Sequence, residues 1–259
     1  MRIDKLDVLY VVMANELRII SREPGGLVLL VLLPYFIAGG MSFIASFFVR
    51  VTSGIFLRQF IGLEVLMLSI IMVQTGGARF LWEEKNGGRL ESLLATPTSM
   101  YVILFGTSMV MIVVNLGAFT IASLPIIYIS AGITGIVRLV IALILLFIGL
   151  LPLYGIGLLI VGLIMKFNDA DTIMNVVTPI LTILSGTTYP IYVLPLWIKE
   201  LIYALPMYMT FYSMYLEMIG HGNVMLITEL LLATVIYLIL GGMTSYARFE
   251  RDLRSRGGV

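Results

Sequence analysis

Residues 83–97 read Glu-Glu-Lys-Asn-Gly-Gly-Arg-Leu-Glu-Ser-Leu-Leu-Ala-Thr-Pro and form the densest polar island in a very apolar chain. Long apolar runs lie on both sides of this island, so we expect it at a membrane surface. Leu90, Leu93 and Leu94 fall at positions i, i+3 and i+4, which share one face of a helix. Pro97 ends that helix, because the residue before a proline is pushed out of helical geometry. The island therefore predicts a short amphipathic helix, preceded by a turn at Gly87 and Gly88, across the base of two membrane spans.

The composition places the chain in a membrane. Of its 259 residues 60% are hydrophobic and only 12% are charged, and the mean hydropathy is +1.06. Soluble domains carry about 25% charged residues. The sequence therefore predicts an integral membrane protein. The first apolar stretch carries charged residues and no small-residue cleavage site, so we do not expect it to be a cleaved signal peptide.

The residue types that most enzymes need are scarce. The absence of cysteine excludes disulfides, thiolate metal sites and cysteine nucleophiles, and His221 is the one histidine. No Gly-x-x-x-x-Gly-Lys-Ser/Thr phosphate loop occurs, so the chain has no such means of binding ATP. We therefore expect a protein that is not an enzyme, with no catalytic residue, no metal site, no cofactor of its own and no nucleic-acid partner.

Six apolar runs predict an all-α protein with six transmembrane helices, since a span needs about 20 apolar residues and the chain is long enough for six. They cover residues 25–49, 59–78, 100–127, 139–165, 172–184 at the start of the fifth span, and 225–247. The loop before the fifth run holds Asp169 and Asp171, either of which can cap the next helix. Glycines at 132 and 135 mark the turn between the third and fourth spans.

Two further segments do not fit a simple span. Residues 1–23 place basic residues among apolar ones at helical spacing, which predicts an interfacial helix at the N-terminus. Residues 185–216 are rich in Gly, Pro and aromatic residues, and the uncharged run 201–216 is too short to cross comfortably. We expect this second region to be a short re-entrant segment on the outer side.

Lysine and arginine set the orientation. Twelve of these residues fall on the side that holds both termini and the polar island, against four on the other side. Because cytoplasmic loops carry the excess of positive charge, the protein is predicted to be a multi-pass protein of the cell membrane with both termini in the cytoplasm.

Two parts of the sequence resemble the type-2 ABC transporter permeases, the family of exporter membrane subunits. The elements Glu83-Glu84-Lys85, Gly88, Leu90-Glu91-Ser92-Leu93-Leu94 and Thr96-Pro97 are similar to the coupling helix that follows the second span in that family. About 90 residues later, the positions that resemble the outer end of the family's fifth span are Ser185-Gly186, Pro190, Pro195, Trp197 and Pro206.

The resemblance implies a single permease domain over residues 1–259. It also implies an assembly of two permease chains, identical or different, with two ABC ATPase subunits that bind ATP and magnesium. The cytosolic coupling helix would dock into a groove of the ATPase and transmit its closure into the membrane, so that an amphipathic or lipid-like substrate moves outward. The residues assigned to this coupling are Glu83, Glu84, Arg89, Leu90, Glu91, Leu93, Leu94, Thr96 and Pro97.

Three polar residues within the spans are candidates for a substrate path. Glu64 and Glu229 are acidic residues near the predicted outer ends of the second and sixth spans, where we expect both to reach water. Asn115 lies in the middle of the third span and can equally hydrogen-bond a neighbouring helix. Two other functions stay open. One is an ion-coupled secondary transporter that uses Glu64 and Glu229, and the other is a non-transporting membrane scaffold.

Overall fold

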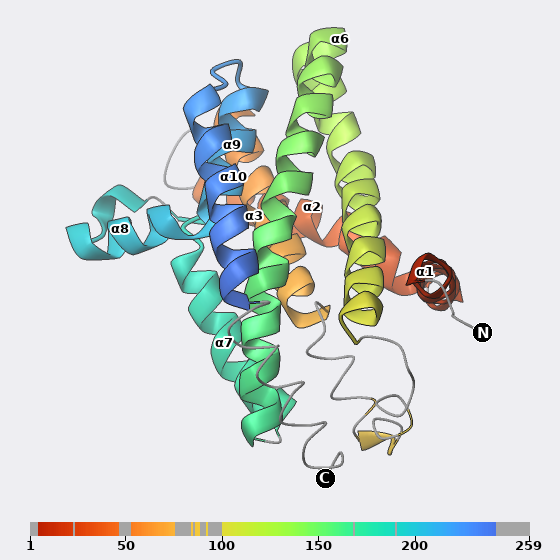
Figure 1. The fold of residues 1–259 in the computed structure, drawn as a ribbon. Helices are drawn as coiled ribbons and strands as arrows, with labels where there is room; N and C mark the ends of the chain where they lie inside the picture. The colour runs from red at the N-terminus through yellow and green to blue at the C-terminus, as the bar shows by residue number, and fades with distance from the viewer. Residues whose placement is uncertain are drawn as a thin grey trace.

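A computed structural model describes residues 5–22, 24–46, 53–75, 84, 86–88, 92, 100–167, 169–189 and 191–241. The described residues lie in helices and short turns, which confirms the all-α class (Figure 1). In chain order the helices are α1 (Lys5–Arg22), α2 (Pro24–Ser46), α3 (Ser53–Thr75), α6 (Met100–Phe167), α7 (Ala170–Leu184), the 3-10 helix η1 (Ile191–Val193), α8 (Leu196–Ala204), α9 (Pro206–Met218) and α10 (Val224–Ile239).

The element α6 is two antiparallel helices joined at Gly132. The backbone of Gly132 has φ 59° and ψ −143°, a conformation open almost only to glycine. The chain reverses there, so the runs Val102–Ile129 and Gly132–Val161 form the tall hairpin of Figure 1. The predicted turn at Gly132 is confirmed, whereas Gly135 lies inside the second run, which begins earlier than the predicted start of the fourth span.

Within the part of the chain that the structure describes, three helices are long and apolar enough to cross a membrane. They are Phe56–Gln74 and the two runs of the α6 hairpin. The pair Leu6–Arg22 and Pro24–Gly40, bent by 74°, makes a fourth if it counts as one broken span. The described parts of α7 and α10 are apolar but shorter, since 15 and 16 residues rise only about 22–24 Å against roughly 30 Å of hydrocarbon. The chain is thus an integral membrane protein, and the count of six spans stays a prediction.

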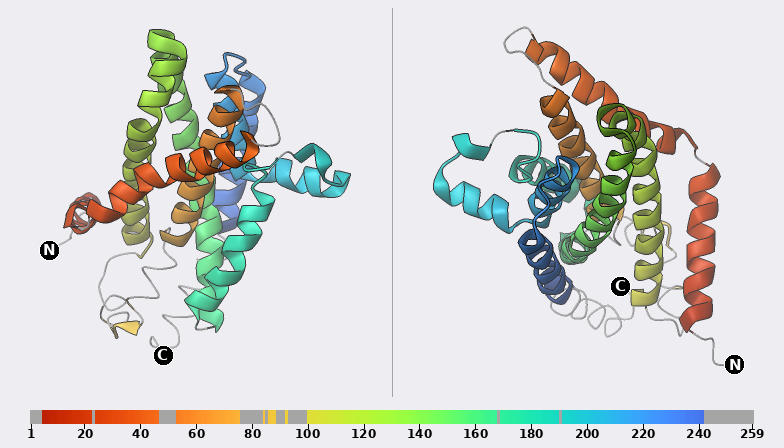
Figure 2. Two further views of the ribbon diagram at one scale, coloured as in Figure 1. Left: turned by 180° about the vertical axis from the view of Figure 1, so that it is seen from behind. Right: turned by 90° about the horizontal axis from the view of Figure 1, so that it is seen from above.

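The two N-terminal helices lie against the outside of the bundle. Seen from above, α1 and α2 run along two successive sides of the α6 hairpin and α3 (Figure 2). Leu9 and Val12 of α1 pack on Gly106 of α6, while Leu6 and Tyr10 of the same helix are exposed. The apolar side of α1 is therefore shared between the bundle and its surroundings, and its interfacial position stays a prediction.

The predicted outer region 185–216 forms the 3-10 helix η1 and two short α-helices. α8 has nine residues, and the extended backbone of Leu205 separates it from the 13 residues of α9, whose first residue is Pro206. α8 projects sideways from the bundle, whereas α9 runs along the α6 hairpin (Figure 1). Ile202 is the buried residue of α8, whereas most residues of α9 are buried. How this region lies relative to the bilayer stays a prediction.

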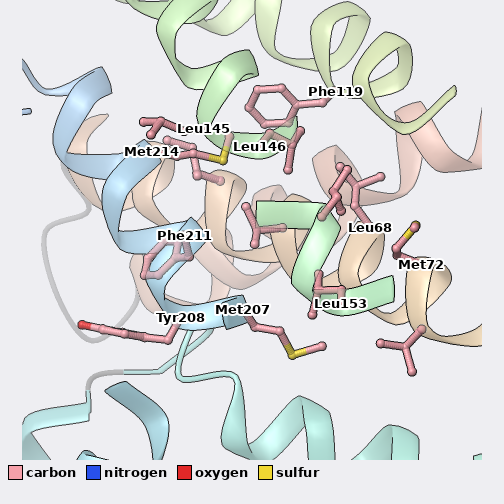
Figure 3. Packing of buried hydrophobic residues seen from close by; sticks show 14 of the residues in the cluster. Leu68, Met72, Phe119, Leu145, Leu146, Leu153, Met207, Tyr208, Phe211 and Met214 are labelled. Atoms are coloured by element: carbon pink, nitrogen blue, oxygen red, sulfur yellow. The ribbon is translucent and has the colours of Figure 1, made fainter. Parts of the chain in front are cut away.

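The core lies where α3, α6 and α9 meet. Side chains of all three helices interdigitate there, including Leu68 and Met72 of α3, Leu145, Leu146 and Leu153 of α6, and Met207, Phe211 and Met214 of α9 (Figure 3). Gly149 of α6 lets α9 approach closely, because a Cβ atom at that position would clash with the Thr210 side chain. α7 begins as predicted, since the Asp169 carboxylate accepts a hydrogen bond of 2.9 Å from the Thr172 N–H.

Candidate functional site

The polar island joins two helices at one end of the bundle. α3 ends at Thr75 and α6 begins at Met100, and both ends lie on the same side of the molecule, where α7 also begins (Figure 1). A displacement of the segment 76–99 would therefore pull on two long buried helices at once. This position suits a segment that passes a force into the bundle.

The described part of the island contains its turn. Gly87 and Gly88 form a turn in which Gly88 has φ 67°, so the turn predicted at these glycines is confirmed. Glu84 is helical and half-buried, and Ser92 is helical and exposed. The other coupling candidates lie outside the described residues: Glu83, Arg89, Leu90, Glu91, Leu93, Leu94, Thr96 and Pro97. Their assignment to a coupling helix stays a prediction.

Glu64 lies in the interior of the bundle. Its side chain is 0% exposed, and neither carboxyl oxygen has a hydrogen-bond partner among the residues that the structure describes. We expected Glu64 to reach water near the outer end of its span, and this expectation is wrong. Other helices cover its position on α3, which packs against α2, α6, α7 and α9. A carboxyl group buried without a partner is costly, which marks the position as a functional candidate.

The contacts of Tyr35 on α2 show at which height in the bundle Glu64 lies. The Tyr35 ring packs on Phe60 of α3 at 5.0 Å between centroids, and its hydroxyl donates to the Ala122 carbonyl of α6. Glu64 lies one turn beyond Phe60 on α3. Tyr35 was not among the residues predicted from the sequence. A tyrosine in the middle of an otherwise apolar run was the available signal, since a buried hydroxyl needs a partner.

Asn115 lies on α6 at nearly the same level as Glu64. Glu64 comes four residues after Phe60 on α3, and Asn115 comes seven residues before Ala122 on the antiparallel run of α6. Along the bundle axis, Glu64 therefore lies about 6 Å from the level of Tyr35, and Asn115 lies about 10 Å from it in the same direction. Asn115 is 1% exposed, and its Nδ2 finds no acceptor within the described part of the chain. The structure thus brings two unsatisfied polar groups, one acceptor and one donor, to a similar depth on two helices that pack together.

Glu229 belongs to a different part of the bundle. It lies about one and a half turns into α10, which Asn223 caps through a bond of 2.9 Å to the Met225 N–H. Glu229 is half-buried, and α10 packs on α6 and α9. Among the described residues no three His, Cys, Asp or Glu side chains gather as a metal site would require. The buried candidates are therefore Glu64 and Asn115, with Glu229 apart from them.

Comparison with known proteins adds one match. The family model described as ABC-2 type transporter matches residues 8–218, which run from α1 to the end of α9. The matched range contains the polar island, Glu64 and Asn115 and stops before Glu229. A search of curated proteins gives no match.

Proposed function

The chain belongs to the ABC-2 type transporter family and is a membrane permease subunit of an ABC transporter, and from this premise we propose that it exports an amphipathic or lipid-like substrate. A separate ATPase subunit supplies the energy. Two permease chains and two ATPase chains form the assembly, and the ATPases bind ATP and magnesium. Both termini and the polar island face the cytoplasm, in keeping with the excess of lysine and arginine on that side.

The observation that carries this proposal is the position of the polar island. It joins the ends of α3 and α6 on one side of the bundle, and it lies inside the range that matches the family. In the proposed mechanism Glu84, Arg89 and Glu91 contact the ATPase, while Leu90, Leu93 and Leu94 hold the short helix against the ends of the spans. Closure of the ATPases on ATP then moves the island and the two helix ends joined to it, which shifts α3 against the second run of α6 and opens a path for substrate.

Leu93→Asp tests the coupling step. The change places a charge at an apolar seam, which costs far more than the loss of one exposed polar contact. We expect the permease to insert and dimerise, to lose most ATPase on co-purification and to lose stimulated hydrolysis. The matched control is Ser53→Asp at the far end of α3, which should leave both unchanged. Normal ATPase association and transport in a folded Leu93→Asp protein would show that the island is an ordinary loop.

The substrate path in this proposal involves Glu64 and Asn115. Each carries a polar group without a partner in the described structure, so each gains a partner when the helices part and a polar part of the substrate enters. Glu229 would lie nearer the exit. Cysteine in place of Asn115 should react with a thiol reagent only when ATP is trapped. Equal protection in both states would remove Asn115 from the path.

The burial of Glu64 also favours a second candidate, an ion-coupled transporter. That candidate requires an acidic group well inside a span, and Glu64 is fully buried and lies at the middle of α3, not near its outer end. The two functions differ in their energy source. Proteoliposomes that contain the permease with a hydrolysis-deficient ATPase should show no transport under a proton gradient if ATP drives export. Gradient-driven transport that Glu64→Gln abolishes would establish the second candidate instead.

A further inference from the structure

The turn between α9 and α10 is built around Gly220. The His221 N–H donates to the Leu216 carbonyl at 2.8 Å, and the Gly220 N–H donates to the Glu217 carbonyl at 3.0 Å. These two bonds form a Schellman motif, which ends a helix with a residue in the left-handed conformation. Gly220 fills that position with φ 82°.

The Schellman motif leaves the Met218 carbonyl free, and a side chain from another helix takes it. Arg138, in the second run of the α6 hairpin, donates from Nη1 to this carbonyl at 3.2 Å. A guanidinium at the carboxyl end of a helix also interacts favourably with the helix dipole. Arg138 therefore completes the cap of α9 from a distance of 80 residues in the sequence.

Gly220 also leaves the space that the Arg138 guanidinium occupies, because it has no side chain. A Cβ atom at this position would lie 2.7 Å from Nη2 of Arg138 and 3.0 Å from its Cζ. Glycine therefore serves two purposes here, the left-handed backbone and the close contact with Arg138. On the other side of the turn, the Glu217 carboxyl group folds back onto Gly222. The turn thus lies close to an arginine of the hairpin and to a carboxyl group of its own helix.

This contact lies at the end of the bundle opposite the last residue of α3, Thr75, and the first residue of α6, Met100. The α9–α10 turn and the tip of the α6 hairpin are at the same end in Figure 1. We propose that Arg138 holds α9 on the second run of α6 throughout the transport cycle, so that the two move as one body when the path opens. The transport measurement that tests this inference rests on the proposed function, whereas the distance measurement does not. Arg138 is then a positioning residue that keeps α9 fixed relative to the second run of α6 while α3 moves.

Paired spin labels test the single body directly, since the chain has no cysteine of its own. Ile133 at the hairpin tip and His221 in the turn that ends α9 are both exposed and accept labels. With Arg138 present we expect one narrow distance distribution, identical without nucleotide and with ATP trapped. A distance that shifts between the two states would overturn the proposal. The measurement on the permease alone remains valid even if no ATPase associates, so a failed proposed function and a failed clamp are distinguishable.

A double-mutant cycle tests whether Arg138 and Gly220 act as a unit. Arg138→Ala should broaden the distance distribution and lower transport about tenfold, because a hydrogen bond to a charged donor is lost. It should leave ATPase association and basal hydrolysis unchanged, and Arg138→Lys should restore part of the transport. Gly220→Ala should lower transport less in the Arg138→Ala background than in the natural chain, because the guanidinium that the added methyl group would meet is absent. Additive effects, or a narrow distribution in Arg138→Ala, would show that Arg138 holds nothing. Lys199→Ala on α8 is the control for loss of a cation.

Discussion

Replacing Glu64 by methionine should make the protein more stable and less active. The carboxyl group is fully buried with neither oxygen bonded in the described structure. An unsatisfied buried polar group costs about 1–3 kcal/mol. Methionine has a similar length and no polar group, and its flexible chain adapts to the existing space. Glu64→Met should therefore raise the free energy of unfolding by about 1–3 kcal/mol.

The assay is thermal unfolding of the purified permease in detergent, together with transport in proteoliposomes. For a chain of this size about 1 kcal/mol corresponds to roughly 2–4 °C, so we expect an increase of several degrees in the midpoint and a clear loss of transport. Glu229→Met is the matched control. Because Glu229 is half-buried, the midpoint should change by no more than about 2 °C. A lower midpoint for Glu64→Met would mean that the carboxylate has a stabilising partner in the assembly, and the argument from its isolation would be refuted.

Three other changes test the fold. A cysteine at Lys166 should be shielded from an impermeant thiol reagent in intact cells while one at Asn223 is labelled, and the reverse pattern would invert the proposed orientation. Gly149→Val should lower the free energy of unfolding by about 1–3 kcal/mol, because the added side chain meets Thr210 and overpacks the contact of α6 with α9; an unchanged midpoint in thermal unfolding would contradict that contact. Hydrogen bonds from the first turn of α7 lower the pKa of Asp169 below its ordinary 3.8, so the cap stabilises the helix above that pH and is lost as the pH falls through the lowered value. Amide exchange in the first turn should therefore quicken in acid and in Asp169→Ala at neutral pH, and no difference at neutral pH would show that the cap contributes nothing.

Features that depend on neighbours in the sequence were predictable. The turn at Gly132 follows from a glycine between two long apolar runs, and the cap at Asp169 follows from a carboxylate just before an apolar helix. The break before Pro206 had a signal as well, because proline starts helices and disrupts their interiors. In each case the determining interaction lies within a few residues of the signal.

The burial of Glu64 was not predictable in the same way. Hydropathy along the chain indicates where a span begins and ends, and therefore how far a residue lies from the end of its own helix. It does not show which other helices pack against that residue. Glu64 is buried because α3 is surrounded by four other helices. The contacts of Tyr35 with Ala122 and of Arg138 with Met218 join residues 87 and 80 positions apart. Such pairs depend on the packing of whole helices, which no local pattern in a single sequence specifies.

The two ends of the bundle are connected through α3. This helix meets the polar island just after Thr75, carries Glu64 near its middle, and places Gly62 against the Thr187 backbone and Phe211 of α9. Glu64 lies 11 residues from the end of α3, so a shift at that end needs to travel only about 16 Å along one helix to reach it. Because close-packed helices transmit strain, the same shift would press on α9 beside Gly62. α9 is held at its other end by Arg138, so the displacement would change the contact of α3 with α9 and not the contact of α9 with α6. In the proposed mechanism, motion that starts at the polar island would thereby be directed to the region around Glu64.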